Sequence, residues 1–322
     1  MALCAILGGG CAGGGGDRGG HTLTLGSYAS ARDLFHDGLI PGFVATWRTE
    51  HREALRFRES YQGSGHQSRA VIMGFEADVV ALSIAPDADR IAAAGLMSAN
   101  WDRPPAGGPL ASTAVVLAVR AGNPAAIRGW ADLARPGIAV VMPNPKVSGG
   151  ARWTVAALYA AAMHGAVSGV PARDPAAAER YLAAVIANVA TMSKSARDAM
   201  LLFERGIGDV IVTYENEVIA SRRAGTGVVA IVPEVTLRVE LPVAVVTAYA
   251  DRHGELEAAH AFMRYLQTAE AGGIMARFGY RGAGDVPPPG MLTIADLGGW
   301  ERVSPILFGS DGMFLRALAA AP

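Results

Sequence analysis

Short strand-like segments alternate with helix-like segments along most of this 322-residue chain. The run LTLGSY, residues 23–28, alternates as a strand does, and a helical pattern opens at Ser30. ADVVALSI at residues 77–84 predicts a buried strand, and the alanine-rich run at residues 151–167 predicts a long helix. Because such interleaving is typical of strands joined by crossover helices, we predict an α/β protein with mainly parallel sheets.

The chain is long enough to form two lobes. The segments at residues 104–110 and 231–241 bracket a middle portion whose strands and helices could close on themselves. We therefore predict a first lobe at residues 21–111, a second lobe at 112–239, and a return to the first lobe at 240–322. The two bracketing segments would be crossing strands that form a hinge.

Charge and cysteine content exclude several classes of function. The 28 basic and 29 acidic side chains leave a net charge of −1, so no general field draws the protein to nucleic acid or to anionic lipid. Any anion that it binds must be held by local geometry. Both cysteines, Cys4 and Cys11, precede residue 12, so residues 12–322 can hold neither a disulfide nor a thiolate metal site.

Residues 1–20 are predicted to be an export signal followed by a tether. The apolar run MALCAILGGGC is too short to span a bilayer, and AGGGGDRGG after it has the composition of a flexible linker. The arrangement resembles a bacterial lipoprotein signal peptide in which Cys11 is the lipidated residue. The alternative is a low-complexity N-terminus without a targeting role.

Four predicted helix starts have small residues and a serine where a helix exposes unpaired N–H groups and the positive end of its dipole. They are Ser30 with Asp33, the run Gly63-Ser64-Gly65 with Ser64 as N-cap, the run Ser148-Gly149-Gly150, and Ser195 with Asp198. Each serine alone most simply caps its helix. Gly149 and Gly150 indicate more, because two successive glycines reduce stability unless the backbone must approach something closely.

No segment has the pattern of a catalytic or metal site. Ser64 and Ser148 lack the G-x-S-x-G spacing of a hydrolase nucleophile. His253, Glu255 and His260 lack the H-E-x-x-H spacing of a zinc site and are predicted to be solvated helix residues. We therefore expect neither an enzyme nor a metalloprotein, and no cofactor.

Several longer segments together resemble the periplasmic sulfate-binding proteins of ABC importers. They are SYASARDLF, ESYQGSGHQSRAVIMGFEADVVALS, STAVVLAVRAGNP, WADLARPGIAVVMPNPKVSGGARW, SARDAMLLFERGIGDVIVTYENE and ELPVAVV. The likeness runs from about Leu23 to beyond Trp300, and its most specific part is PNPKxSGGARW together with ERGIGDV and ENE. It implies a two-lobed periplasmic-binding-protein fold of type II that closes on a dehydrated sulfate and delivers it to a membrane ABC permease.

The resemblance also implies the ligand contacts. The donors would be the main-chain amides of Ala29, Ser64, Gly149, Gly150 and Ala196, the hydroxyl of Ser148, and the phenol of Tyr214. Tyr214 stands where the family usually has a tryptophan, and a phenol differs from an indole in length and direction. Arg152 and Arg197 are expected to orient the backbone or pair with carboxylates. We expect a monomer in the periplasm or another extracytoplasmic location, attached to the membrane only through Cys11.

The chemistry of the anion leads to the same function. Sulfate at neutral pH is a dianion without a proton, so a pocket that holds only hydrogen-bond donors satisfies it without Arg or Lys. Hydrogen phosphate carries a proton that needs an acceptor, so a donor-only pocket is predicted to reject it. We predict a binding protein for sulfate, with thiosulfate as a second ligand. Molybdate or tungstate binding is the nearest alternative, and a two-lobed oxyanion-binding enzyme or sensor is the alternative of another class.

Overall fold

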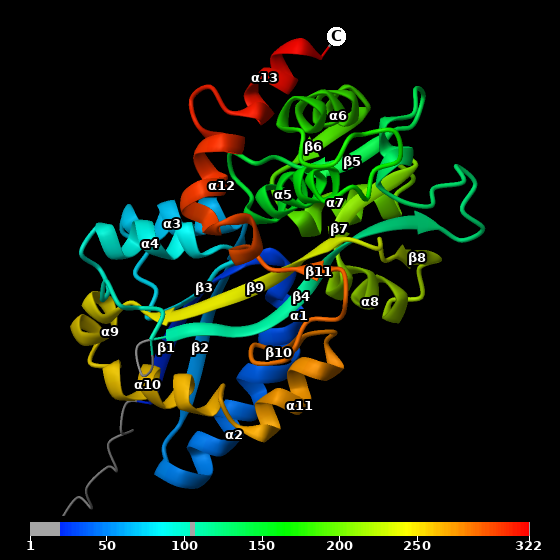
Figure 1. Ribbon diagram of the computed structural model, residues 1–322. Coiled ribbons are helices and arrows are strands. Elements are labelled where there is room, and N and C mark those ends of the chain that lie inside the picture. Colours follow the sequence, from blue (N-terminus) through cyan, green and yellow to red (C-terminus); the bar gives the residue numbers. More distant parts are fainter. Residues whose placement is uncertain (1–19, 104–106, 322) are drawn as a thin grey trace, which may run out of the picture.

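The structure, a computed structural model, describes residues 20–103 and 107–321. Two α/β lobes share one curled sheet that has helices on both of its faces (Figure 1). Among the described residues the strand order is β2-β1-β3-β9-β4-β7-β5-β6, and β8, β10 and β11 pair beside this path. The predicted α/β class is confirmed. The predicted signal peptide and its lipidated Cys11 lie outside the described residues.

The elements follow one another along the chain much as the alternating pattern predicts. The strands are β1 (His21–Tyr28), β2 (Leu55–Gln62), β3 (Val79–Ala81), β4 (Gly107–Arg120), β5 (Val140–Pro143), β6 (Val189–Ser193), β7 (Val210–Tyr214), β8 (Val228–Ile231), β9 (Thr236–Val245), β10 (Arg281–Gly282) and β11 (Met291–Leu292). The helices are η1 (Ala29–Ala31), α1 (Arg32–Leu34), η2 (Phe35–Leu39), α2 (Ile40–His51), α3 (Ser64–Ile72), α4 (Ala85–Ala93), η3 (Trp130–Ala134), α5 (Gly149–Met163), α6 (Pro175–Ala187), α7 (Ala196–Glu204), α8 (Glu215–Arg223), α9 (Thr247–His253), α10 (Leu256–Tyr265), α11 (Ala269–Arg277), η4 (Ala295–Leu297), α12 (Gly299–Phe308) and α13 (Met313–Ala320).

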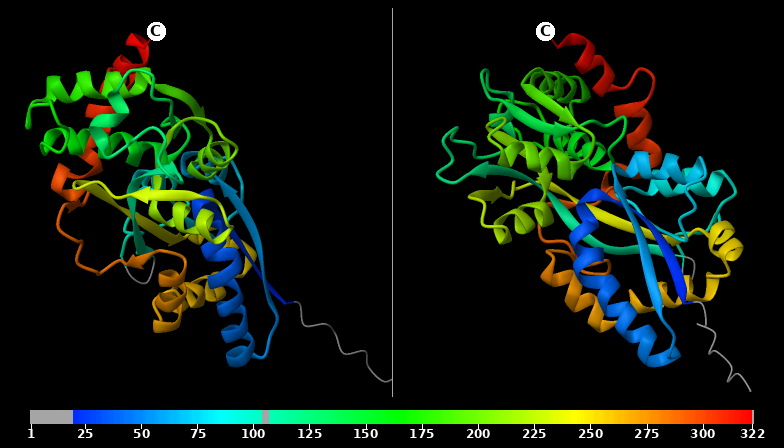
Figure 2. Two further views of the ribbon diagram at one scale, coloured as in Figure 1. Left: turned by 90° about the vertical axis from the view of Figure 1, so that its right-hand side faces the viewer. Right: turned by 180° about the vertical axis from the view of Figure 1, so that it is seen from behind.

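The first lobe is built on the parallel strands β2, β1 and β3, with β9 antiparallel to β3. Helix α2 lies beside β2 (Figure 2). On this face Phe43 packs against Phe262 of α10, with ring centroids 5.0 Å apart. Helices α3 and α4 cover the opposite face, where Val71, Leu82 and Ile91 belong to a second buried cluster. Burial of both faces explains why β3 is continuously apolar and does not alternate.

The second lobe repeats this arrangement. Strands β6, β5 and β7 are parallel, and β4 pairs antiparallel with β7. Helix α5 packs on the sheet through an alanine-rich surface, and its residues from Trp153 to Leu158 are all buried. Helix α7 packs on the other face, where Met200 and Phe203 join Ile211 in a further apolar cluster.

Two long strands cross from one lobe to the other. The first half of β4 pairs with β9, from Ala111 opposite Leu241 to Ala114 opposite Arg238. The second half pairs with β7 and β8 of the second lobe. The predicted hinge of two crossing strands is therefore confirmed as part of the fold.

The C-terminal helices lie on the second lobe. Helix α12 packs against α5, with the rings of Trp300 and Trp153 edge to face at a centroid distance of 4.8 Å, and α13 packs against α6. Arg316 of α13 also forms an ion pair of 2.6 Å with Glu179 of α6. The prediction that residues 240–322 return to the first lobe is therefore wrong for residues 299–320, because their apolar side chains cover α5 and α6. The other predicted boundaries stay predictions.

Within residues 20–103 and 107–321, the helices are all too short or too polar to cross a membrane.

Candidate functional site

The carboxyl ends of six parallel strands meet between the lobes. Strands β1, β2 and β3 come from the first lobe, and β5, β6 and β7 come from the second. Ligands of open α/β sheets bind outside the carboxyl ends of the strands, where the following helices begin. A small cavity with a volume of about 180 Å³ lies at this point. Its lining is Tyr28, Ala29, Ser30, Gln62, Gly63, Ser64, Ser83, Ser148, Gly150, Ser195, Ala196 and Tyr214.

Most of the predicted ligand residues lie together in this lining. They are Ala29, Ser64, Ser148, Gly150, Ala196 and Tyr214. Gly149 lies beside the cavity and faces Ser83 and Ser64. The structure thus brings together residues that are up to 185 positions apart in the chain.

Two of the predicted helix caps are confirmed. Ser148 caps α5 by accepting a hydrogen bond from the amide of Ala151 at 3.4 Å. Ser195 caps α7 by accepting from the amide of Asp198 at 3.0 Å. Because each side chain binds an amide deeper in the helix, the first amides of both helices keep their freedom to bind a ligand.

The other two predicted caps are wrong. Gly63 holds the N-cap position of α3, and Ser64 is the first helical residue. The Ser64 hydroxyl instead donates to Asp87 at 2.5 Å and accepts from the amide of Ser83 at 3.0 Å. At the start of η1 the N-cap is Tyr28, and Ser30 forms no cap hydrogen bond. The helix starts are where the sequence predicts them, while the Ser64 hydroxyl serves tertiary contacts.

The glycines of the helix starts allow the lobes to approach closely. A Cβ atom at Gly149 would lie 2.8 Å from Oγ of Ser83, and one at Gly150 would lie 3.1 Å from the hydroxyl of Tyr214. A Cβ atom at Gly63 would lie 2.5 Å from the carbonyl oxygen of Lys194 in the second lobe. The sequence predicts that the backbone at Gly149 and Gly150 approaches something closely. In the structure the closely approaching groups are protein atoms, from the opposite lobe at Gly149 and from a neighbouring strand end and helix start at Gly150.

Two of the serine hydroxyls at the cavity already donate a hydrogen bond within the protein. Ser64 donates to Asp87, and Ser195 donates to Asp198 at 2.9 Å. The Ser148 hydroxyl accepts from the amide of Ala151, so its own proton remains free to donate. Of these three serines, Ser148 is therefore the one equipped to donate to a ligand through its side chain.

Ser83 is a cavity residue that the sequence analysis missed. It follows strand β3 in the first lobe, and its Oγ lies 2.8 Å from the hydroxyl of Tyr214 in the second lobe. Burial raises the pKa of Tyr214 well above its ordinary value of 10, so the phenol keeps its proton. A hydroxyl both donates and accepts. The pair can therefore also accept a hydrogen bond, a capacity that the predicted donor-only pocket does not include.

Among the described residues, the cavity lining includes neither lysine nor arginine. Arg197 follows Ala196 directly but binds Asp33 of the first lobe at 2.9 Å and the buried Glu217 at 3.2 Å. Arg152 donates from Nε to the carbonyl oxygen of Pro145 at 3.3 Å. The predicted roles of both arginines, pairing with carboxylates and orienting the backbone, are confirmed. The positive potential at the cavity comes from helix N-termini.

Comparison with known proteins identifies the family. The bacterial extracellular solute-binding protein family matches residues 40–281. The sulfate-binding protein of Synechococcus elongatus is 38% identical over 91% of this chain and 85% of its own length. That of Escherichia coli is 36% identical over 89% of this chain and 90% of its own. The chain belongs to the sulfate-binding protein family.

A solved structure of the sulfate-binding protein family has the same fold. The sulfate-binding protein SubI from Mycobacterium tuberculosis H37Rv matches with a TM-score of 0.80 and 36% identity, over 89% of this chain and 99% of that one. A periplasmic thiamin binding protein matches with a TM-score of 0.66 at 16% identity, which shows the fold alone. The two-lobed fold of type II that the sequence predicts is therefore confirmed.

In this member of the sulfate-binding protein family the two lobes touch around the cavity. The Nε1 atom of Trp153 in α5 donates to the carbonyl oxygen of Ser83 at 2.6 Å. Asn216 of α8 donates to the carbonyl oxygen of Ser30 at 3.1 Å. Together with the bond between Ser83 and Tyr214, these contacts hold the lobes in a closed arrangement.

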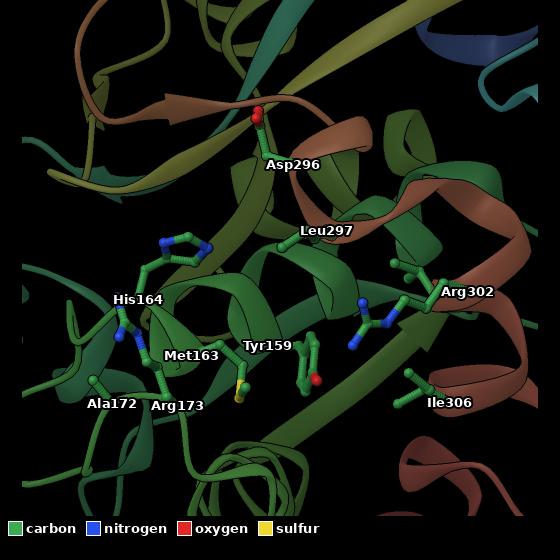
Figure 3. A pocket seen from close by; sticks show the side chains of 10 residues that line it. Tyr159, Met163, His164, Ala172, Arg173, Asp296, Leu297, Arg302 and Ile306 are labelled. Carbon is green, nitrogen blue, oxygen red and sulfur yellow. The ribbon is translucent and has the colours of Figure 1, made fainter.

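A larger cavity of this family member lies elsewhere. It encloses about 1210 Å³ of empty space, against about 180 Å³ between the lobes, and lies between the end of α5 and α12. Figure 3 shows the side chains of Arg173 and Arg302 on opposite sides of Tyr159. Both arginines are exposed, and none of the six strand ends contributes to the lining. We call it the outer cavity. It lacks converging helix N-termini, so the smaller cavity between the lobes is the candidate site.

Two of the three residues that the sequence analysis considered as a metal site, His253 and Glu255, form ion pairs with distant parts of the first lobe. His253 binds Asp78 at 2.7 Å and Glu76 at 2.9 Å, and Glu255 binds His21 at 2.8 Å. In the described part of the chain, three or more His, Cys, Asp or Glu residues nowhere gather as a metal site would require.

Proposed function

We propose that this protein captures sulfate or thiosulfate between its lobes and delivers the anion to a membrane ABC permease. The observation that carries the proposal is a cavity lined by helix N-termini and hydroxyls, in which no described residue contributes a cationic side chain. Relatives support the choice of anion, since a thiosulfate-binding protein of Pseudomonas aeruginosa is 34% identical over 84% of this chain. It joins the sulfate-binding relatives described above.

The ligand would be held by neutral donors from both lobes. They are the amides of Ala29 and Ser64 from the first lobe, and from the second lobe the amides of Gly149, Gly150 and Ala196 and the hydroxyls of Ser148 and Tyr214. Main-chain N–H groups at a helix N-terminus form strong hydrogen bonds to an anion, and the dipole of each helix adds to them. An unprotonated tetrahedral dianion can be surrounded by such donors without a counterion.

Binding would act by closing the lobes. A ligand that bonds to both lobes stabilises the closed form by its difference in affinity for the closed and the open form. The cross-lobe bonds of Ser83 with Tyr214 and of Asp33 with Arg197 form only when the lobes meet, so they favour the same state. The permease would recognise this closed form.

The proposed location is the periplasm, with the protein as a monomer held at the membrane through Cys11. The proposal includes no catalytic step, because Ser64 and Ser195 donate to carboxylates, Ser148 caps a helix and Ser83 pairs with Tyr214, and in the described part of the chain none of these four hydroxyls is paired with a histidine base.

Calorimetry on protein that lacks residues 1–20 tests this function. Sulfate is expected to bind once per chain and to be recovered chemically unchanged, and molybdate is the competitor that separates the nearest alternative. A variant that removes a donor, Ser148→Ala, should weaken sulfate binding by about tenfold, the loss expected for a hydrogen bond to a charged group. Absence of stoichiometric sulfate binding, or tighter binding of molybdate, would contradict the proposal.

A further inference from the structure

The hydroxyls of Ser83 and Tyr214 form a pair at the cavity. Their oxygen atoms are 2.8 Å apart, both side chains are 1% exposed, and both line the cavity. No other side-chain contact within hydrogen-bond distance occurs at either oxygen in the described part of the chain. Whatever these hydroxyls offer beyond their mutual bond is therefore directed to the ligand.

The count of protons and lone pairs defines what the pair offers. Two hydroxyls have two protons, and their mutual hydrogen bond uses one proton and one lone pair. If Ser83 donates to Tyr214, the phenol proton is left for the ligand, and Oγ of Ser83 keeps lone pairs. If Tyr214 donates, the two roles are exchanged. In either state the pair presents one donor and one acceptor.

The neighbouring carboxylates do not provide this acceptor. Asp87 and Asp198 are outside the cavity lining, and each accepts a hydrogen bond from a cavity serine, Ser64 and Ser195 respectively. The acceptor at the Ser83–Tyr214 pair is neutral, so it can accept a hydrogen bond from a protonated anion without repelling the charge of that anion.

We propose that the Ser83–Tyr214 pair extends the ligands of this site to tetrahedral dianions that carry one proton, of which hydrogen phosphate is the simplest. The inference rests on the proposed function, since it concerns the same cavity. The P–OH group would donate to one hydroxyl oxygen of the pair, while the other hydroxyl donates to a second oxygen of the anion. Sulfate remains the better ligand, because it accepts from every donor of the cavity without needing this acceptor.

Three anions separate the role of the proton from that of charge and shape. Sulfate and fluorophosphate are tetrahedral dianions without a proton, and hydrogen phosphate is a similar dianion with one. Their affinities are measured by calorimetry above neutral pH on the wild-type protein, on Ser83→Ala and on Tyr214→Phe. Each variant leaves one hydroxyl of the pair. This hydroxyl can still donate to the ligand or accept from it, but when it accepts, its own O–H group no longer has the second hydroxyl as a hydrogen-bond acceptor.

Ser221→Ala is the matched control. Ser221 is also a buried serine with a side-chain partner, Thr226, but it lies near the end of α8 and away from the cavity. We expect Ser83→Ala and Tyr214→Phe to weaken hydrogen phosphate about tenfold more than they weaken sulfate or fluorophosphate, as the loss of one hydrogen bond to a charged ligand implies. The control should leave all three affinities within about twofold of wild type.

Three outcomes would overturn the inference. If wild-type protein binds sulfate but no hydrogen phosphate at millimolar concentration, the pair does not act as an acceptor, and the proposed function stands. An equal loss for all three anions in both variants would make the pair a general support of the cavity. If wild-type protein binds none of the three anions, the proposed function fails as well.

Discussion

The two cavities of this protein differ in a way that runs against simple electrostatic intuition. The outer cavity is larger, with about 1210 Å³ of empty space against 180 Å³, and has the side chains of Arg173, Arg302 and His164 on its walls. The cavity between the lobes has no cationic side chain among the described residues. Only the cavity between the lobes has helix N-termini from both lobes directed to one point.

The difference bears on what would make the proposed anion site. An exposed guanidinium is hydrated and screened, and its long side chain loses entropy when it is fixed on a ligand. Main-chain amides at a helix start are fixed already by the fold, so they lose little entropy on binding. We therefore expect the position and burial of the donors to count for more than formal charge at the proposed site. The predictions below test this comparison.

Filling the cavity between the lobes should have the largest effect. A Cβ atom at Gly150 would lie 3.1 Å from both Cβ of Ala196 and the hydroxyl of Tyr214, and the two methyl groups of a valine would extend into the cavity. We expect Gly150→Val to weaken sulfate binding about a thousandfold, or ~4 kcal/mol, as measured by calorimetry. Gly272→Val is the control, since a Cβ placed at Gly272 would lie more than 4 Å from every described atom outside its own turn of helix. If Gly150→Val bound sulfate with wild-type affinity, the sulfate site would have to lie outside this cavity.

Removing a charge just outside the cavity should have the next largest effect, on stability. Glu217 is fully buried, and burial raises its pKa while Arg197, 3.2 Å away, acts in the opposite direction. Arg197→Ala leaves this carboxylate without its cation and should lower the free energy of unfolding by about 3 kcal/mol near neutral pH. Unfolding in urea measures the loss.

The loss in Arg197→Ala should depend on pH. The pKa of Glu217 is higher in the folded than in the unfolded protein, so its stabilising contribution is complete below the unfolded value and decreases as pH rises. The variant should therefore be less destabilised at pH 5 than at pH 8, relative to wild type. The double variant Arg197→Ala/Glu217→Gln removes the charge and should recover part of the stability at pH 8. A loss that is equal at both pH values in the single variant would show that the ion pair is not its cause.

Local signals in the sequence predict much of this site. The alternation of strands and helices gives the fold class, and the caps Ser148 and Ser195 depend on residues only three positions away. The double glycine at residues 149 and 150 also marks a close approach that the structure contains. These features are predictable because the interactions that cause them span one helical turn, or because glycine is unfavourable without a reason.

The features that the sequence does not reveal depend on distant contacts. The Ser64 hydroxyl donates to Asp87, 23 positions away, so a pattern typical of a cap is misleading. Ser83 has no motif of its own, and its role depends on a phenol 131 positions further along the chain. The placement of α12 and α13 on the second lobe depends on which apolar surface is left uncovered, which is a property of the folded protein.

Removing the charges of the outer cavity should have the smallest effect. Arg173→Gln/Arg302→Gln keeps side chains of similar length and hydrogen-bonding capacity but removes two positive charges from the walls seen in Figure 3. If converging amides and not formal charge make the anion site, sulfate affinity should stay within about twofold of wild type at low and at physiological salt, because exposed charges are screened over ~10 Å. The rate of association at low salt is the quantity most open to change, since distant charges act on encounter more than on the bound state. A loss of affinity comparable to that of Gly150→Val would reverse the comparison and place the anion among the arginines.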